Sequence, residues 1–244
     1  MSRKWVEESV AAHASASADE DYGYGWWIER ESEVGGEYSA QGRGGQRIVV
    51  LPALNAVLVT TGGSFEPSDA TDLLAPALVD PENPLPANPD GVARLQEALT
   101  LVRQAPAPRP IEALPATATT ISGTTFAFGP NALEMATLRL SFPRPSEAEV
   151  LLTFHDGRRP PASSIGLDGV YRMGPALSEN SFGLQAGFRG RWEDAHTFAL
   201  EYDEIASRDA FLLTLRFGDG TITVEAKERS HQAPIRLEGR IVGN

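Results

Sequence analysis

Apolar and polar residues alternate through most of the second half of this chain of 244 residues. One such run places apolar side chains at every second position: Phe211, Leu213, Leu215 and Phe217. A Gly-Asp-Gly turn at residues 218–220 follows, and a new alternating run begins with Ile222 and Val224. Strict alternation is typical of strands that bury one face, and turn residues between runs are typical of antiparallel connections. Residues 119–244 are therefore predicted to form an all-β antiparallel barrel or sandwich of about eight strands.

A proline-rich stretch separates this segment from the first part of the chain. Residues 105–118 read APAPRPIEALPATA and contain four prolines. Proline removes a backbone hydrogen-bond donor and favours an extended backbone, so this stretch is predicted to be a semi-rigid linker. The predicted organisation is one domain at residues 1–104, the linker, and the β-domain at residues 119–244.

The first segment, residues 1–104, mixes strand and helix patterns. Residues 46–51 and 56–61 are β-branched runs separated by a short stretch that contains a proline, which predicts a hairpin. Both runs are nearly continuous in apolar residues, so we expect both faces of their sheet to be covered. One helix is predicted to begin at Ser68 and another at Pro89. The segment is therefore predicted to have an α+β fold.

Composition narrows the classes of function. The net charge of −12 disfavours binding to nucleic acid or to an anionic membrane. The chain contains no cysteine, which excludes disulfides and thiol catalysis. Its four histidines are scattered without the spacing of metal ligands, so we predict no metal site and no cofactor.

No segment is predicted to target or cross a membrane. The first residues, MSRKWVEESV, lack the apolar stretch of a signal peptide. No apolar run approaches the roughly 20 residues that a membrane helix needs. The compartment is left open, with the cytoplasm as the default expectation.

Several stretches share a pattern with a known enzyme family. Residues 22–27 read YGYGWW, residues 39–52 read SAQGRGGQRIVVLP and residues 55–63 read NAVLVTTGG. Together they resemble the last strands of the serine β-lactamase-like hydrolases, also called penicillin-binding-protein-like or class C-like esterases and peptidases. Beyond the linker, residues 166–172 and 190–204 resemble the lipocalin-like β-domain that some of these hydrolases carry. The resemblance spans nearly the whole chain, in family order, and implies a partial β-lactamase/transpeptidase-like sheet with C-terminal helices before the β-domain.

The resemblance also implies a cleft-lining strand. In the family this strand often carries Lys or His, and here Gln41 or Arg43 would have to serve instead. Backbone N–H groups near the glycines would face the cleft, where a developing oxyanion needs donors. Part of the aromatic cluster at residues 22–27 would flank the floor of the cleft. The alternative, which stays open, is that these aromatic side chains pack in the core. The predicted cleft-lining residues are Trp26, Gln41, Gly42, Arg43, Gly44, Gly45 and Gln46.

The catalytic motifs of the family are absent from these residues. The chain has two lysines, Lys4 and Lys227, and neither belongs to a Ser-x-x-Lys motif. Tyr-x-Asn is absent as well, and Ser178-Glu179-Asn180 fits Ser-x-Asn only beyond the linker. A serine nucleophile needs a base within hydrogen-bonding reach, so we predict no catalytic residue in this chain. We expect a truncated or split serine hydrolase that is inactive alone. Its expected partner is the missing N-terminal catalytic portion, with a homo-oligomer as a second option.

A second hypothesis is a non-catalytic binding or interaction module. A β-barrel can hold a small ligand in its interior. An interior packed solid with apolar side chains would oppose that hypothesis, and the alternation marks these as inward-facing: Leu138, Leu140, Phe211, Leu213 and Ile235.

A cluster of acidic residues in the β-domain invites an interpretation as paired catalytic carboxylates. Its members are Glu193, Asp194, Glu201, Asp203 and Glu204. Glu201 and Asp203 share the strand face opposite the apolar side chains, so we expect solvated carboxylates. Solvated carboxylates lack the apolar burial that separates a general acid from a general base. We therefore predict no catalytic role for the cluster.

Overall fold

The computed structural model describes residues 1–30, 36–62, 86–177, 184–205, 207, 209–229 and 233–242. The chain divides into two compact units, Met1–Leu99 and Thr100–Asn244, and each is described by itself. Two of the sequence predictions lie outside the described residues: the helix that begins at Ser68, and the Ser178-Glu179-Asn180 motif.

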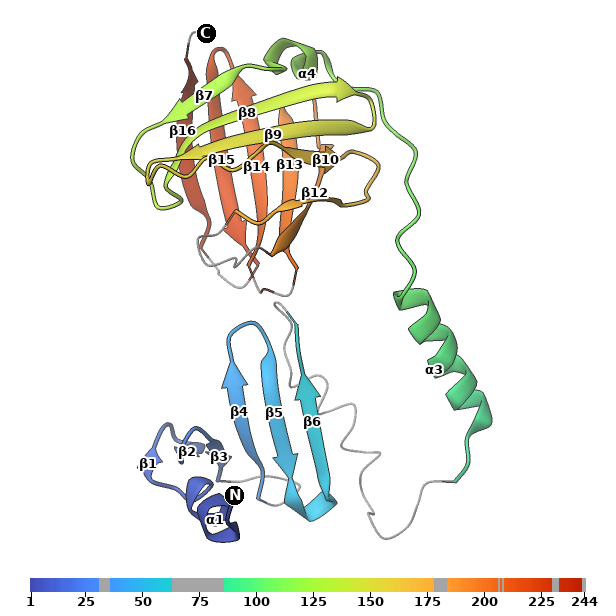
Figure 1. Cartoon of the computed structure of the whole chain (residues 1–244), viewed down its shortest axis with the longest axis vertical. Helices are drawn as coiled ribbons and strands as arrows, with labels where there is room; N and C mark the ends of the chain where they lie inside the picture. Colours follow the sequence, from blue (N-terminus) through green and yellow to red (C-terminus); the bar gives the residue numbers. More distant parts are fainter. Residues whose placement is uncertain are drawn as a thin grey trace. The chain divides into compact units, whose positions relative to one another are not determined.

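The first unit contains a small antiparallel sheet. Its described strands pair in the order of the chain, and β4 to β6 form a meander (Figure 1). The strands are β1 (Ala14–Ser15), β2 (Glu20–Tyr22), β3 (Trp27–Glu29), β4 (Tyr38–Gly42), β5 (Gln46–Leu51) and β6 (Ala56–Thr60). The short helix α1 (Arg3–Ser9) precedes them, and the Ser2 hydroxyl caps it by accepting a hydrogen bond from the Trp5 backbone N–H.

The predicted hairpin is confirmed. Strands β5 and β6 pair antiparallel, with Val50 opposite Val57 and Ile48 opposite Val59. A short 3-10 turn, η1 (Pro52–Leu54), connects them and ends at Asn55, whose φ of 47° lies in the left-handed region. Asparagine enters that region more readily than most residues, so the local sequence agrees with the connection.

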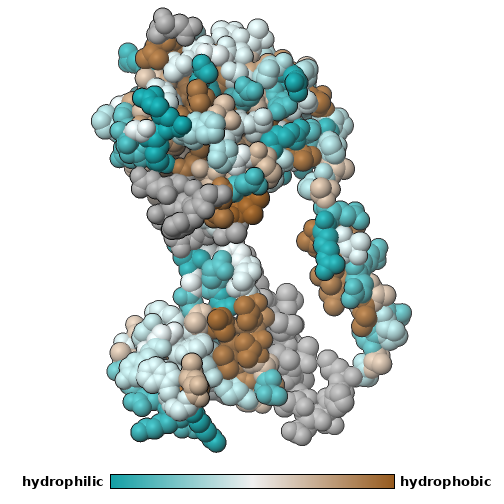
Figure 2. Space-filling model, viewed as in Figure 1, coloured by the Kyte–Doolittle hydropathy of each residue, from teal (hydrophilic) through white to brown (hydrophobic). Residues whose placement is uncertain are grey.

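The two faces of this hairpin differ in burial. Val49 and Leu51 on one face are 0% and 3% exposed, whereas Ile48, Val57 and Val59 on the other are 41%, 62% and 59% exposed. Figure 2 shows the apolar side chains gathered over this sheet. The prediction that both faces are covered is therefore wrong. A continuous apolar run indicates that both faces of a strand favour burial, but it does not show which residues would bury them.

Helix α3 (Pro89–Val102) confirms the helix that the sequence predicted to begin at Pro89. Asn88 precedes it, and its side-chain oxygen accepts a hydrogen bond from the Gly91 backbone N–H at 2.8 Å. No residue of α3 is buried, and its apolar side chains at Val92, Leu95 and Val102 are exposed. The expected packing of C-terminal helices on a β-lactamase-like sheet is therefore not seen among the described residues.

The second unit is a closed barrel, one of the two architectures, barrel or sandwich, that the alternation predicted. Its described strands form one ten-stranded sheet, and a pairing between β10 and β12 closes nine of them, while β11 extends beside β12. The first five strands are β7 (Thr125–Phe128), β8 (Met135–Arg144), β9 (Glu147–Phe154), β10 (Ser163–Gly166) and β11 (Arg172–Pro175). The others are β12 (Gln185–Trp192), β13 (Thr197–Glu204), β14 (Ala210–Gly218), β15 (Thr221–Glu228) and β16 (Ile235–Ile241). The closing pair is parallel, at Gly166 and Arg189, so the prediction of a wholly antiparallel β-domain is wrong at this contact.

Apolar side chains fill the barrel. The inward positions of facing strands form one buried cluster that includes Leu138, Leu140 and Leu213, and Phe211 and Ile235 pack against it. Helix α4 (Ala116–Ile121) adds the buried side chains of Ala118 and Ile121. The predicted end of the linker at residue 118 therefore lies inside a helix that packs on the barrel.

Candidate functional site

The predicted cleft-lining run forms a hairpin turn. Gln41 and Gly42 end β4, Gln46 begins β5, and Gly42 pairs with Gln46 across the turn. Gly44 and Gly45 lie between them with φ values of 83° and 91°, a region that side chains with a Cβ rarely adopt. The glycines thus serve the turn geometry, and Arg43 lies in the same turn.

Side-chain hydrogen bonds fasten this turn to β6. The Thr60 hydroxyl donates to the Gly45 carbonyl oxygen at 2.8 Å, and the Gln46 side-chain amide donates to the Gly62 carbonyl. Trp26, the other predicted residue, packs edge-on against Tyr38 with ring centroids 5.2 Å apart. Trp26 and the turn therefore belong to the same unit. Among the described residues, no contact between them brings a reactive side chain into a shared site.

Neither lysine of the chain makes a hydrogen bond to a serine among the described residues. Lys4 lies on α1 in the first unit and Lys227 on β15 in the second. No group of three or more histidine or acidic side chains in the described ranges could hold a metal ion. Among the helices that the structure describes, none is both long and apolar enough to cross a membrane.

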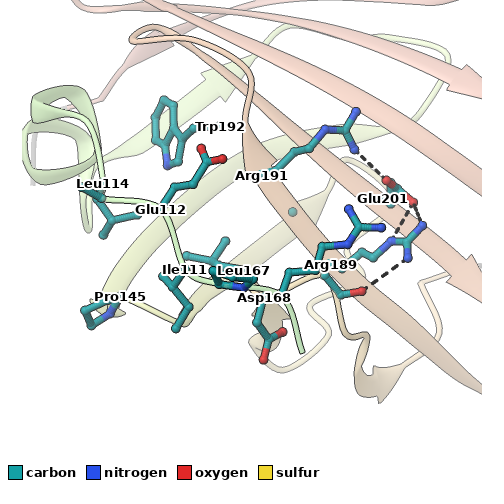
Figure 3. A pocket seen from close by; sticks show the side chains of 15 residues that line it. Ile111, Glu112, Leu114, Pro145, Leu167, Asp168, Arg189, Arg191, Trp192 and Glu201 are labelled. Carbon is teal, nitrogen blue, oxygen red and sulfur yellow. Dashed lines mark hydrogen bonds and ion pairs between the residues drawn. The ribbon is translucent and has the colours of Figure 1, made fainter. Parts of the chain in front are cut away.

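A groove on the outer face of the barrel is one concave site that described residues form. It measures about 320 Å³ and lies between residues 109–114 of the linker and strands β12 and β13 (Figure 3). The Arg109 backbone N–H donates to the Asp168 carbonyl oxygen at 2.7 Å, which holds the linker at one end. At the other end, the hydroxyl of Thr117 lies 3.4 Å from the Nδ1 atom of His196. The proline-rich linker thus forms one wall of a site, a role that the sequence did not predict.

The turn beneath the linker is fixed by an ion pair. Arg172 donates from Nη2 to the Asp168 carboxylate at 2.9 Å, and this hydrogen bond lowers the pKa of Asp168. Gly169 follows with a φ of 81°, and a Cβ there would meet the Arg109 side chain at 3.2 Å. The close approach of the linker therefore depends on a glycine at this position.

One wall of the groove is a charged network centred on Glu201. Arg189 lies directly opposite Glu201 across β12 and β13 and donates to its Oε2 atom from Nε at 2.9 Å and from Nη2 at 2.6 Å. Arg191 donates to Oε1 at 2.9 Å, and the Tyr171 hydroxyl donates to Oε2 at 3.3 Å. The Arg189 guanidinium also lies over the Tyr171 ring, 4.4 Å from its centroid. Figure 3 shows both arginines converging on this carboxylate.

This network keeps Glu201 ionised. Burial raises the pKa of the carboxyl, but the hydrogen bonds and charges of Arg189 and Arg191 outweigh burial and leave the pKa lowered. Burial raises the pKa of the Tyr171 hydroxyl. A carboxylate held by two guanidinium groups is a poor general base, so the network can orient groups but is not suited to proton transfer.

The acidic cluster of the sequence therefore divides in three ways. Glu201 is half-buried and paired, and Asp203 pairs with Arg229 at 3.0 Å. Glu204 is buried, and its carboxylate accepts a hydrogen bond from the Tyr202 hydroxyl. The expectation of solvated carboxylates, made for Glu201 and Asp203, is wrong for Glu201, because cross-strand register brings arginine donors that sequence spacing does not reveal.

The opposite wall of the groove is mainly apolar and carries one carboxylate, that of Glu112. Ile111 and Leu114 come from the linker, Leu167 from the loop after β10, and Trp192 from the end of β12 (Figure 3). The Trp192 Nε1–H is buried and has no hydrogen-bond partner among the residues that the structure describes. An apolar wall that faces a few fixed polar groups is the usual composition of a small-molecule site.

Comparison with known proteins identifies no family. No protein-family model matches the chain, and no curated protein matches it. Among solved structures, a partial match is the crystal structure of secretory abundant heat soluble protein 4 from Ramazzottius varieornatus. The sequence identity is 8%, the match covers 44% of this chain and 69% of that chain, and the TM-score is 0.35. A similarity this low carries no argument about fold or function.

Proposed function

We propose that residues 1–104 are the closing part of a serine β-lactamase-like hydrolase, and that this chain is catalytically silent until another polypeptide supplies the nucleophile and base. The motifs at residues 22–27, 39–52 and 55–63 support the family, and the missing Ser-x-x-Lys and Tyr-x-Asn motifs support the silence. The observation that carries the proposal is the exposed apolar face of the β5–β6 hairpin, which we name the open face and define by Ile48, Val57 and Val59.

The open face has the properties of a docking surface. Burying a valine or isoleucine side chain fully is worth about 1.5–3 kcal/mol, so leaving three of them exposed forgoes several kcal/mol of stabilisation. Strand β6 pairs with β5 alone within the described sheet, so its other side offers unpaired backbone groups to a further strand. A polypeptide that adds a strand beside β6 and packs on the open face would satisfy both demands.

Helix α3 offers a second uncovered apolar surface. Val92, Leu95 and Leu99 recur at three- and four-residue spacing and are exposed. An amphipathic helix gains most of its stability by packing its apolar stripe, because isolated helices of this length are marginal in water. A partner that covers both the open face and α3 would account for these two surfaces together.

Activity measurements test the silence of the isolated chain. The purified chain is incubated with p-nitrophenyl acetate and with a fluorophosphonate probe, beside an active serine esterase as positive control. We expect no burst and no covalent adduct. Stoichiometric labelling of any hydroxyl side chain would refute the proposal, because acylation would then proceed without the family's activated serine.

Reconstitution tests the docking. The chain is coexpressed with the polypeptide encoded immediately upstream, which the proposal requires to carry Ser-x-x-Lys and Tyr-x-Asn. We expect an active complex that V59D abolishes, because a carboxylate on the open face opposes burial. The matched control is V6D, which adds the same charge at an exposed apolar position of α1 and should leave assembly unchanged. An upstream sequence without these motifs, or equal effects of both variants, would contradict the proposal.

A second candidate function is small-ligand binding by the barrel, and the groove favours it. The interior is filled by a single apolar cluster, so the outer groove is the better location for a ligand. An NMR titration with a mixture of small apolar fragments tests this. Shifts confined to residues such as Ile111, Leu114 and Trp192 are expected. Shifts of interior residues such as Leu138 would favour an internal site instead.

A further inference from the structure

A second hollow on the outer face of the barrel carries a local excess of positive charge. It measures about 300 Å³ and lies beside the groove, with which it shares Arg191 and Glu201. Its cationic side chains are Arg191, Lys227 and Arg229, and the single carboxylate in its lining is Glu201. Glu193 and Asp203, outside this lining, pair with Arg191 and Arg229, so Lys227 is the positive charge that remains among the described residues.

Lys227 is the cation in this lining that stands unpaired. Arg191 binds Glu201 and Glu193, and Arg229 binds Asp203. The structure gives Lys227 no ion pair and no hydrogen bond within the described residues. The three N–H donors of its ammonium group are therefore available to bind an external anion.

The strand register explains why Lys227 stays unpaired. Glu201 lies opposite Leu212 on the next strand, and Leu212 lies opposite Lys227 on the strand after that. Neighbouring strands are about 4.8 Å apart, so roughly 10 Å of sheet separate the backbones of Glu201 and Lys227. The apolar Leu212 side chain, 37% exposed, fills the position between them.

The hollow therefore combines an unpaired cation with an apolar and aromatic surface. Leu212 contributes its exposed side chain, and the Tyr171 ring is held in place by the Arg189 guanidinium above it. We propose that this hollow binds a small organic monocarboxylate, with the carboxylate on Lys227 and an aromatic or branched apolar body against Leu212 and Tyr171. The proposal is independent of the hydrolase proposal above.

The charges around the hollow favour a monoanion. Glu201 and Asp203 lie on β13, next to the strand that carries Leu212, and each is already paired with arginine. Like charges repel at these distances, so a dianion such as a phosphate monoester would need more than the one unpaired cation that Lys227 supplies. An apolar body adds burial of Leu212 that a bare inorganic ion cannot provide.

An NMR titration of the full chain with naphthoate tests the site. We expect saturable shifts of Leu212, Lys227 and Tyr171, with a dissociation constant on the order of 0.1–1 mM for a ligand of this size in an open hollow. K227M keeps the aliphatic stem and removes the charge, and it should weaken binding by about tenfold. K4M is the matched control, since it removes the other lysine of the chain, and it should bind like the wild type.

Two further arms make the test decisive. Naphthamide has the same shape without the charge and should bind about tenfold more weakly, because the charge-assisted hydrogen bond is lost. L212D places a carboxylate beside Lys227 and should block naphthoate while leaving the spectrum of the barrel dispersed. Equal binding of naphthoate and naphthamide, equal affinity in wild type and K227M, or shifts centred on Ile111 and Leu114 would overturn the proposal. None of these readouts depends on acyl transfer, so failure here leaves the fluorophosphonate result unaffected.

Discussion

The two sheets of this chain bury their apolar side chains to different extents. The barrel strands turn apolar side chains inward, and closure through β10 and β12 buries most of them in one cluster. The sheet of the first unit carries apolar residues on both faces of β5 and β6, and one of these faces is open. In this chain, alternation marks strands whose apolar face is buried by other strands of the same barrel. The continuous apolar run marks strands whose second apolar face is buried only if another polypeptide packs on it.

The largest expected difference concerns the two parts in isolation. A fragment of residues 105–244 should fold cooperatively, because it contains the barrel together with α4 and the linker that packs on it. A fragment of residues 1–104 should be insoluble or poorly folded, because the open face and the free side of β6 remain uncovered. Circular dichroism during thermal unfolding and two-dimensional NMR spectra distinguish these outcomes.

The choice of fragment end sharpens this prediction. A fragment that starts at residue 119 divides α4 and loses Ala118, which is fully buried. It should still fold but melt at a lower temperature than residues 105–244. Sharp, dispersed spectra from residues 1–104 would contradict this prediction. They would show that the sheet of the first unit folds without a partner, as the barrel is expected to do.

Sequence patterns predicted the barrel well because its strands are long and one-sided. Residues 222–226 alternate strictly and residues 211–217 alternate except at Leu212, and the structure places both runs in paired strands. The short strand β10 and its parallel contact with β12 carry no such signal. Closure depends on the tilt and register of the whole sheet, which are long-range properties that local patterns do not contain.

The candidate sites were harder to predict for a similar reason. The glycine-rich run could be located by sequence, but two left-handed glycines make it a turn between β4 and β5. The outer groove depends on the linker returning to the barrel, and the available signal was the presence of Ile111 and Leu114 in a proline-rich stretch. The Glu201 network needs the register of β12 and β13, so its arginines could not be assigned from spacing alone.

Alanine substitutions should reveal the difference between buried and open faces at single residues. L138A removes a side chain that is 0% exposed in the barrel, and it should lower the free energy of unfolding by about 2–5 kcal/mol. V57A removes a side chain from the open face, and it should change the free energy by about 0.5 kcal/mol or less. Urea denaturation of the full chain measures both.

The Val57 result is the informative one. A loss of about 2 kcal/mol or more for V57A would mean that the open face is covered in solution, for example by self-association. Sedimentation measurements over a range of protein concentrations would then show whether a second copy provides that cover.

A smaller effect is expected from the charged network on the barrel. E201Q should lower the free energy of unfolding by about 1.5–3 kcal/mol at neutral pH, because hydrogen bonds between charged groups are lost from a half-buried site. The pKa of Glu201 is lowered by Arg189 and Arg191 against the effect of burial, so its contribution is fully present above the unfolded value of 4.5. The contribution disappears as the pH falls through the lower folded value.

The pH dependence separates this network from ordinary surface pairs. Wild type and E201Q should converge in stability in strongly acidic solution, as measured by urea denaturation at several pH values. E193Q is the matched control, because Glu193 makes one exposed pair with Arg191, and it should cost less than about 1 kcal/mol. Equal losses for the two variants at neutral pH would argue against a special role for Glu201.

The smallest expected effect concerns Glu37, a buried carboxyl directly before β4 in the first unit. Burial raises the pKa of Glu37, and the charge of Glu29 raises it further, while Arg47 opposes both. A carboxyl with a raised folded pKa destabilises the folded state at neutral pH, and this penalty disappears as the pH falls and Glu37 binds a proton. E37Q should therefore raise the free energy of unfolding at neutral pH by less than about 1 kcal/mol, because the lost Arg47 interaction offsets part of the gain. Tryptophan fluorescence during denaturation of the full chain in a W192F background reports this unit, because the remaining tryptophans all lie in it. A stabilisation that persists at acidic pH would show that charge is not its cause.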